Sequence, residues 1–190
     1  MGAYLNPGND AFAISVNDDI FVDKSGLISY INSKIGKRKR FICVSRPRSF
    51  GKSMAAEMLV AYYDKSCDSH GLFQGLEVAR EESYQKNLNQ YDVIFLNVQQ
   101  FLSLAGSADK VVESLKQKVL AELRDYYHDV VPPWETELSC ALAAVYAQST
   151  GPNKGFLFVI DEWDCIFREE KDNVDAQKAY LDFLRDLFKD

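Results

Sequence analysis

Apolar residues follow two patterns along this chain, one typical of buried strands and one typical of helices. Continuous apolar runs at residues 41–45, 93–98 and 155–160, and a shorter one at 20–22, predict strands. Apolar positions that recur every three or four residues predict helices over residues 26–34, 53–65, 107–128, 133–148 and 175–190, with Ser107 as the N-cap of the third. Strands that alternate with helices favour a mainly parallel sheet between helical layers. The pattern therefore predicts an α/β fold with three αβα layers.

The composition narrows the class of protein. The chain has 190 residues and a net charge of −6, which argues against broad nucleic-acid binding. No apolar run reaches the roughly 20 residues that a membrane-spanning helix needs. The cysteines lie far apart and form no ligand-like pair, so we expect free thiols and a cytoplasmic protein; they are Cys43, Cys67, Cys140 and Cys165.

The apolar run at residues 41–45 leads into a loop that ends Gly51-Lys52-Ser53, and a helical pattern follows at once. This order is typical of a phosphate-binding loop (Walker A), in which N–H groups of the loop and of the first helical turn converge on phosphate. We expect Lys52 to reach the β- and γ-phosphates and Ser53 to bind magnesium. The predicted nucleotide-binding positions are Arg46, Pro47, Arg48, Ser49, Phe50, Gly51, Lys52, Ser53 and Met54.

Basic residues occur within this loop and before it, and one of them, Arg46, stands where a glycine is usual. The general pattern has glycine where this chain has Arg46, and an arginine in the left-handed conformation costs about 1–2 kcal/mol. Either the loop enters at a different angle, or Arg46 and Arg48 contact phosphate or an acidic neighbour. The basic residues at 34–40 have two interpretations, a solvated helix end or a source of positive potential that favours an anionic nucleotide.

The apolar run at residues 155–160 ends in Asp161-Glu162, as a Walker B strand does. In P-loop NTPases of the additional-strand class, such an aspartate holds magnesium and the following glutamate activates water as a general base. We therefore expect Asp161 and Ser53 as metal ligands, and Glu162 and Lys52 as catalytic residues.

In that class a further strand, later in the sequence, lies between the two motif strands. Because the chain ends in the helix after the Walker B strand, we expect residues 41–190 to form an incomplete, truncated P-loop core, with residues 1–40 as a lead-in segment. The exposed sheet edge that results predicts either pairing with another copy of the chain or a rearranged strand order.

Four ordered segments, NPGNDAF, IFVDKSGLI, SRPRSFGKS and FVIDEWD, together resemble the bacterial AAA-ATPase-like proteins, which are predicted P-loop NTPases related to archaeal and STAND-type ATPases. An arginine at position 46 is common in that family. The resemblance implies that Lys52 and Ser53 bind the nucleotide phosphates and the metal, with Asp161 and Glu162 as the metal-binding and water-activating pair. It also implies that the segment 23–25 lies near the adenine, and that longer relatives continue with the missing strand and a nuclease-like domain.

Two hypotheses for function follow. The first is an ATP-binding module that hydrolyses ATP with Mg²⁺ and thereby drives a conformational change, which Glu162 beside Asp161 favours. The alternative is a nucleotide-dependent switch or assembly module with little turnover, because γ-phosphate sensors and any arginine finger are expected beyond residue 190. A small-molecule kinase fits the chain length but not the Asp-Glu pair. His70 and His128 stand alone in the sequence, so zinc chemistry has no support.

Overall fold

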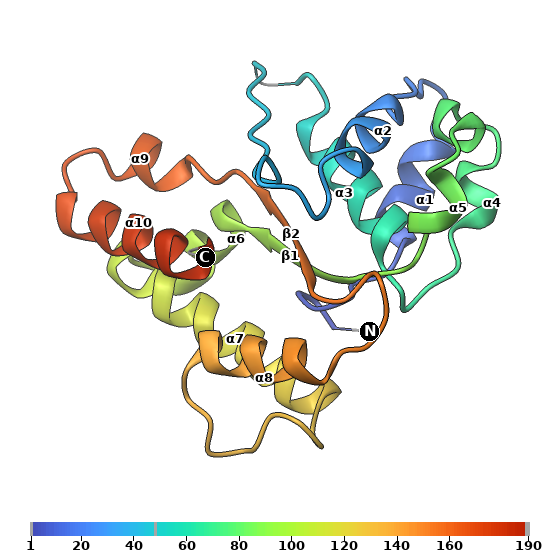
Figure 1. The fold of residues 1–190 in the computed structure, drawn as a ribbon. Helices are drawn as coiled ribbons and strands as arrows, with labels where there is room; N and C mark the ends of the chain where they lie inside the picture. The colour runs from blue at the N-terminus through green and yellow to red at the C-terminus, as the bar shows by residue number, and fades with distance from the viewer. Residues whose placement is uncertain (1, 48, 189–190) are drawn as a thin grey trace. The chain divides into compact units, whose positions relative to one another are not determined.

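The computed structural model describes residues 2–47 and 49–188, and the chain divides into two compact units (Figure 1). The first unit comprises residues 6–93, and the second comprises residues 2–5 together with the chain from residue 94 onward. Each unit buries its own set of apolar side chains, as expected of parts that fold around separate cores. In the described part of the chain, no helix is long and apolar enough to cross a bilayer.

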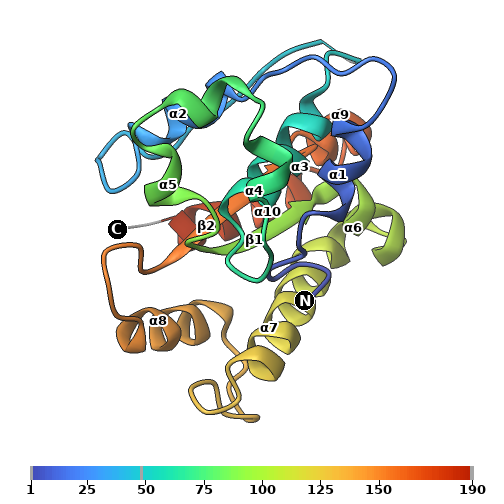
Figure 2. The ribbon, with the colours of Figure 1, turned by 90° about the vertical axis from the view of Figure 1, so that its right-hand side faces the viewer.

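The first unit is built from short helices and irregular segments. Its elements are α1 (Asp10–Val16), α2 (Gly26–Asn32), α3 (Lys52–Tyr63), α4 (His70–Phe73), the 3₁₀ turn η1 (Glu77–Arg80) and α5 (Tyr84–Asn87). α1 packs against α3, as Figure 2 shows. Phe12 of α1 stacks on Phe73 with ring centroids 5.0 Å apart, and Tyr62 of α3 meets the same ring edge-on at 5.3 Å. These three rings are at most 1% exposed, and burying each stabilises the unit by roughly 1.5–3 kcal/mol.

The segment that begins at Asn6 is fixed in the first unit by buried hydrogen bonds. The Asn6 side chain donates to Asp92 Oδ1 and accepts from the Val93 N–H, each at 2.8 Å. The Gly8 N–H donates to Asp64 Oδ2 at 2.7 Å, and Asp64 is fully buried. Because buried polar groups cost free energy unless they are paired, these contacts explain why asparagine, glycine and aspartate occur here. The segment NPGNDAF, the first of the four that resemble the family, therefore has a role in holding the first unit together.

The second unit combines a small sheet with longer helices. Its elements are β1 (Asp92–Asn97), which starts in the first unit, α6 (Val98–Ala105), the 3₁₀ turn η2 (Ala108–Lys110), α7 (Val111–Tyr126), α8 (Leu138–Gln148), β2 (Phe156–Asp161), α9 (Cys165–Glu169) and α10 (Val174–Phe188). β1 and β2 pair in a two-stranded parallel sheet. α6, α8 and α10 each contact α7.

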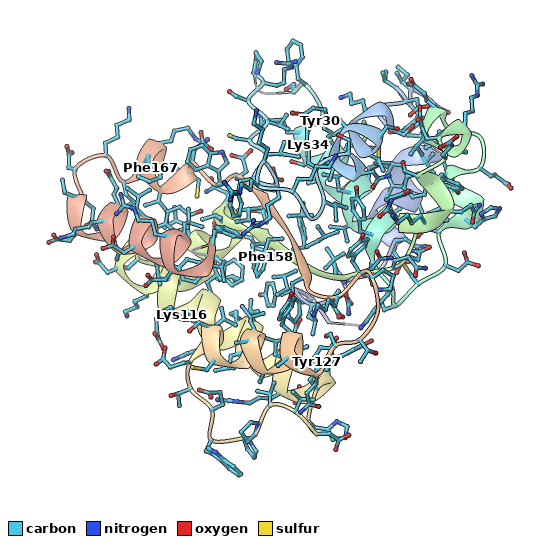
Figure 3. All side chains as sticks on the ribbon, viewed as in Figure 1. Tyr30, Lys34, Lys116, Tyr127, Phe158 and Phe167 are labelled. Carbon is cyan, nitrogen blue, oxygen red and sulfur yellow. The ribbon has the colours of Figure 1, made fainter. Side chains whose placement is uncertain are left out.

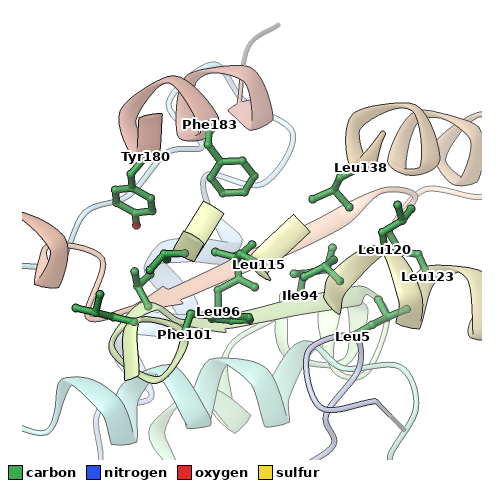
Figure 4. Packing of buried hydrophobic residues seen from close by; sticks show 14 of the residues in the cluster. Leu5, Ile94, Leu96, Phe101, Leu115, Leu120, Leu123, Leu138, Tyr180 and Phe183 are labelled. Carbon is green, nitrogen blue, oxygen red and sulfur yellow. The ribbon is translucent and has the colours of Figure 1, made fainter. Parts of the chain in front are cut away.

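α7 is the centre of the core of the second unit. Its apolar positions recur at helical steps and are at most 4% exposed: Val111, Leu115, Val119, Leu120 and Leu123. Figure 4 shows Leu115 and Leu120 of this helix near Ile94 and Leu96 of β1 and near Leu138 of α8. The apolar residues whose four-residue spacing predicts this helix are therefore the residues that its buried face packs into the core.

Residues 2–5 join the second unit through backbone contacts. The Glu122 carboxylate on α7 accepts from the N–H groups of Ala3, Tyr4 and Leu5 at 2.7, 2.9 and 2.7 Å. Leu5 also forms an antiparallel bridge with Ile94 at the edge of β1. The N-terminal backbone thereby finds partners both on a helix and on the sheet.

Two predicted strands do not form in the described chain. Residues 20–22 and 41–45 are irregular, and Ile20, Phe41 and Val44 are 86%, 56% and 47% exposed. A strand needs the backbone groups of a neighbouring strand, and the two strands that the structure describes pair with each other. The prediction of an α/β chain is confirmed, but the sheet is smaller than the predicted three-layer fold requires.

The predicted starts of two helices were also displaced. α7 begins at Val111, because the chain from Ser107 first makes the turn η2. α8 begins at Leu138, so Pro133 lies in the preceding turn and not in the first turn of the helix.

Candidate functional site

The loop before α3 has the backbone of a tight turn at a helix start. Gly51 is the N-cap of α3 with φ 70°, and Ser49 has φ 64°. Glycine adopts this left-handed conformation freely, whereas Ser49 carries a cost of about 1–2 kcal/mol. Arg46 is not among the described residues with positive φ, so the strained position is Ser49 and not the arginine that replaces the usual glycine.

The first turn of α3 offers N–H groups that have no partner within the helix. These orphan donors and the helix dipole favour an anion at this end, where Lys52 and Ser53 are the first two helical residues. The Lys52 ammonium folds back and donates to the carbonyl oxygens of Arg46 at 3.0 Å and Pro47 at 3.2 Å. Ser53 is exposed. The predicted loop residue Arg48 lies outside the described residues.

A second lysine reaches the same loop. Lys24 Nζ donates to the Phe50 carbonyl oxygen at 2.6 Å, and a Cβ atom placed on Gly51 would meet that ammonium. The two neighbours of Lys24 are held by η1, since Asp23 accepts from the Glu77 N–H at 2.8 Å and Ser25 Oγ accepts from the Val78 N–H at 3.0 Å.

Burial raises the pKa of the Asp23 carboxyl, but hydrogen bonds from the Glu77 backbone and from Ser25 outweigh burial and leave the pKa below its ordinary value. Asp23 is therefore an anion that holds η1 rather than a proton donor. Sequence reasoning missed the contact between Lys24 and the loop, and the available signal was the IFVDKSGLI segment.

The basic residues before the loop are mostly solvated. Lys34 lies over the ring of Tyr30, with Nζ 4.9 Å from the ring centroid; both are labelled in Figure 3. The side chains at 37–40 are exposed, as is Arg46. This arrangement agrees with a solvated helix end, and it leaves positive charge in the unit that carries the loop.

The Asp-Glu pair lies at the carboxyl end of β2 in the second unit. Asp161 is 6% exposed, and its Oδ1 accepts from the Glu162 N–H at 3.0 Å. Its Oδ2 is buried and has no hydrogen-bond partner among the described residues. Because an unpaired buried carboxylate oxygen is costly, this atom has the property expected of a group that receives a cation or a water molecule.

Glu162 turns the chain out of β2 and is held by an arginine. Its φ of 51° is in the left-handed region, a strained conformation for a residue with a side chain. Arg168 of α9 donates to Glu162 Oε2 at 2.7 Å and to Asp164 Oδ1 at 3.0 Å, and it contacts Gln99 Oε1 at 3.4 Å. Hydrogen bonding to Glu162 raises the pKa of Arg168 above its ordinary value. Sequence reasoning missed this arginine, although its spacing from Asp164 is that of a helical ion pair.

The predicted residues thus form two groups, Lys52 and Ser53 in the first unit, and Asp161 and Glu162 in the second. Within the described residues, no group of three or more His, Cys, Asp or Glu side chains could hold a metal ion on its own. Magnesium is compatible with so few protein ligands, because it keeps several waters and takes oxygens from substrate phosphates.

Comparison with known proteins gives one family. A family model described as a predicted AAA-ATPase (AAA-ATPase-like) matches residues 9–190. Neither the curated proteins nor the solved structures contain a significant match to this chain.

Proposed function

The chain belongs to the AAA-ATPase-like family of predicted AAA-ATPases, and from this premise we propose that it binds ATP with Mg²⁺ and hydrolyses it. The observation that carries the proposal is the Gly51-Lys52-Ser53 turn, which opens a twelve-residue helix with a left-handed glycine and a lysine folded over the loop carbonyls. The family implies a P-loop fold. We propose the additional-strand class on the basis of the Asp161-Glu162 pair.

Phosphate binding follows from charge and from free donors. A polyphosphate would accept from the first-turn N–H groups of α3 and from Lys52, which would exchange the carbonyls of Arg46 and Pro47 for phosphate oxygens. A hydrogen bond between two ions is stronger than one to a neutral carbonyl, so the exchange is favourable. The exposed residues Phe50 and Ser53 lie on the same loop and first turn, and Met54 follows them in the helix.

The metal would be held by Ser53 and Asp161. The buried, unpaired Oδ2 of Asp161 and the exposed hydroxyl of Ser53 are oxygen donors, the type that magnesium prefers. When bound, magnesium neutralises the charge that develops on the phosphates.

Glu162 is the proposed general base, which would take a proton from the water that attacks the γ-phosphorus as the bond to ADP breaks. In the structure its Oε2 accepts from Arg168. The arginine thereby occupies one of the two carboxylate oxygens through which Glu162 could accept that proton. This ion pair favours the second candidate function, a nucleotide-dependent switch with slow turnover.

The test measures ATP binding by calorimetry and phosphate release on the same chain. Lys52→Ala removes a charge-assisted contact of about 1.5–3 kcal/mol and is expected to weaken ATP binding about 10- to 100-fold. Lys37→Ala, which removes an exposed charge of the same unit, is the matched control and should change affinity little.

Phosphate release then separates the two candidate functions. ATPase activity predicts release that Glu162→Gln abolishes without loss of ATP binding. A switch predicts binding with little release. Release that survives Glu162→Gln would contradict the role of the base, and an unchanged dissociation constant in Lys52→Ala would contradict both functions.

The partners and the location belong to the same proposal. Within the described residues β2 pairs with β1 on one side and with no strand on the other, which supports self-association through this edge of the sheet. All four cysteines are free thiols, which agrees with a cytoplasmic protein.

A further inference from the structure

Lys24 is positioned by its two neighbours. The carboxylate of Asp23 accepts from the N–H groups of Ser25 and Glu77, each at 2.8 Å, and Ser25, which is fully buried, accepts from the Val78 N–H. Asp23 and Ser25 are thus each hydrogen-bonded to the backbone of η1. These bonds fix the backbone on either side of Lys24, and the Lys24 side chain extends to the phosphate loop.

The contact that Lys24 makes has a direct geometric consequence. Its ammonium binds the Phe50 carbonyl oxygen at 2.6 Å. In a trans peptide the carbonyl oxygen and the next N–H point in opposite directions, and the described residues contain no cis peptide. A lysine that holds the Phe50 carbonyl therefore turns the Gly51 N–H away from itself. That N–H is one of the donors that a phosphate loop uses.

The charge of Lys24 is available to an anion. Among the salt bridges of the described residues, none involves Lys24 or Lys52, and both ammonium groups bind carbonyl oxygens of the loop. Both lysines therefore bring positive charge to the same short loop, one from within its helix start and one from the segment before α2, and this charge attracts a polyphosphate. The loop thus has a charge pattern that fits a di- or triphosphate.

We propose that Lys24 is a positioning residue of the phosphate site, which holds the Phe50 carbonyl, thereby orients the Gly51 N–H toward the anion, and adds positive charge to the loop that Lys52 also contacts. The inference rests on the proposed function, because it assigns a role at the same site. It states which part of the nucleotide Lys24 acts on, namely the polyphosphate and not the adenine. It also gives a physical role to the IFVDKSGLI segment.

The experiment titrates ATP and inorganic pyrophosphate into the chain and three variants. Lys24→Met keeps the aliphatic stem and removes the ammonium, and Lys24→Arg keeps the charge. Lys37→Met removes an exposed charge of the same unit as the control. Thermal unfolding of each variant shows that the chain is folded.

We expect Lys24→Met to weaken the binding of ATP and of pyrophosphate by the same factor, about 10-fold, because the hydrogen bond that orients the Gly51 N–H and one positive charge at the loop are both lost. Lys24→Arg should recover most of the loss, which a merely structural role of the lysine stem would not require. Lys37→Met should stay within about twofold for both ligands, since exposed charges are screened.

Three results would overturn the inference: unchanged ATP affinity in Lys24→Met, an equal loss in Lys37→Met, or a loss for ATP without a loss for pyrophosphate. The last result would place Lys24 at the base end of the nucleotide. If ATP binds and Lys52→Ala weakens it while Lys24→Met does not, only this inference fails. If the unmodified chain binds neither ligand, the proposed function fails with it.

Discussion

Replacing Arg168 by methionine is expected to increase ATP hydrolysis. The arginine holds the proposed base Glu162 at 2.7 Å and Asp164 at 3.0 Å. Methionine keeps most of the aliphatic stem but cannot donate, so both oxygens of the Glu162 carboxylate become available to the attacking water.

The expected size follows from the exposure of the pair. The side chains of Arg168 and Glu162 are 32% and 29% exposed, so solvent screens their attraction. An ion pair of this kind contributes about 1 kcal/mol at most, which corresponds to about a fivefold change in an equilibrium. We therefore expect Arg168→Met to raise the rate of phosphate release at saturating Mg²⁺ and ATP by up to about fivefold.

The assay compares phosphate release at low and high ionic strength. Salt weakens exposed ion pairs, so it should raise the rate of the unmodified chain toward that of Arg168→Met and leave the variant almost unchanged. Arg185→Met is the matched control, because Arg185 pairs with Asp182 at 2.9 Å on α10 in the same unit. A rate in Arg168→Met as low as in Glu162→Gln would refute the reasoning and would show that the arginine is itself required.

Three further predictions concern the first unit. Asn6→Ala should lower the free energy of unfolding by about 1–3 kcal/mol in urea, because it leaves the buried Val93 N–H without its acceptor; a smaller loss would contradict the structural role of this segment. Gly51→Ala places a side chain at φ 70° and should cost about 1–2 kcal/mol, whereas Gly75→Ala, which meets open space, should be nearly neutral; equal effects would contradict the left-handed turn. Burial raises the pKa of Tyr62 from 10.0 to about 12, so above pH 10 the unfolded chain releases a proton that the folded chain keeps. Stability should therefore fall as the pH rises from 10 toward 12, and Tyr62→Phe should flatten this fall; an equal slope would contradict the assignment.

The parts of the fold that local sequence determines were predicted well. β2 ends at Asp161 and α3 begins at Lys52, close to the predicted positions, because an apolar run and a helical period each leave a clear local signal. The buried face of α7 was also evident, since its apolar residues recur at helical steps. These features depend on residues near each other in the chain.

The parts that failed depend on distant partners. The run at residues 41–45 has strand composition, but composition supplies no neighbouring strand, and the segment remains irregular. The contacts of Lys24 with Phe50 and of Arg168 with Glu162 are set by how loops and helices pack, which spacing alone does not reveal. The predicted site residues stand in local motifs that the sequence displays, and their roles stay predictions. The two cations that contact Phe50 and Glu162 come from other segments, which no local motif indicates.

Calorimetric titration with ATP, with and without Mg²⁺, tests most directly whether the Gly-Lys-Ser turn and the Asp-Glu pair act on one nucleotide. The account predicts that Mg²⁺ tightens ATP binding in the unmodified chain, that Asp161→Asn removes this tightening, and that Lys52→Ala weakens binding under both conditions. Equal affinity with and without Mg²⁺, or an Asp161→Asn variant that responds to Mg²⁺ as the unmodified chain does, would contradict it.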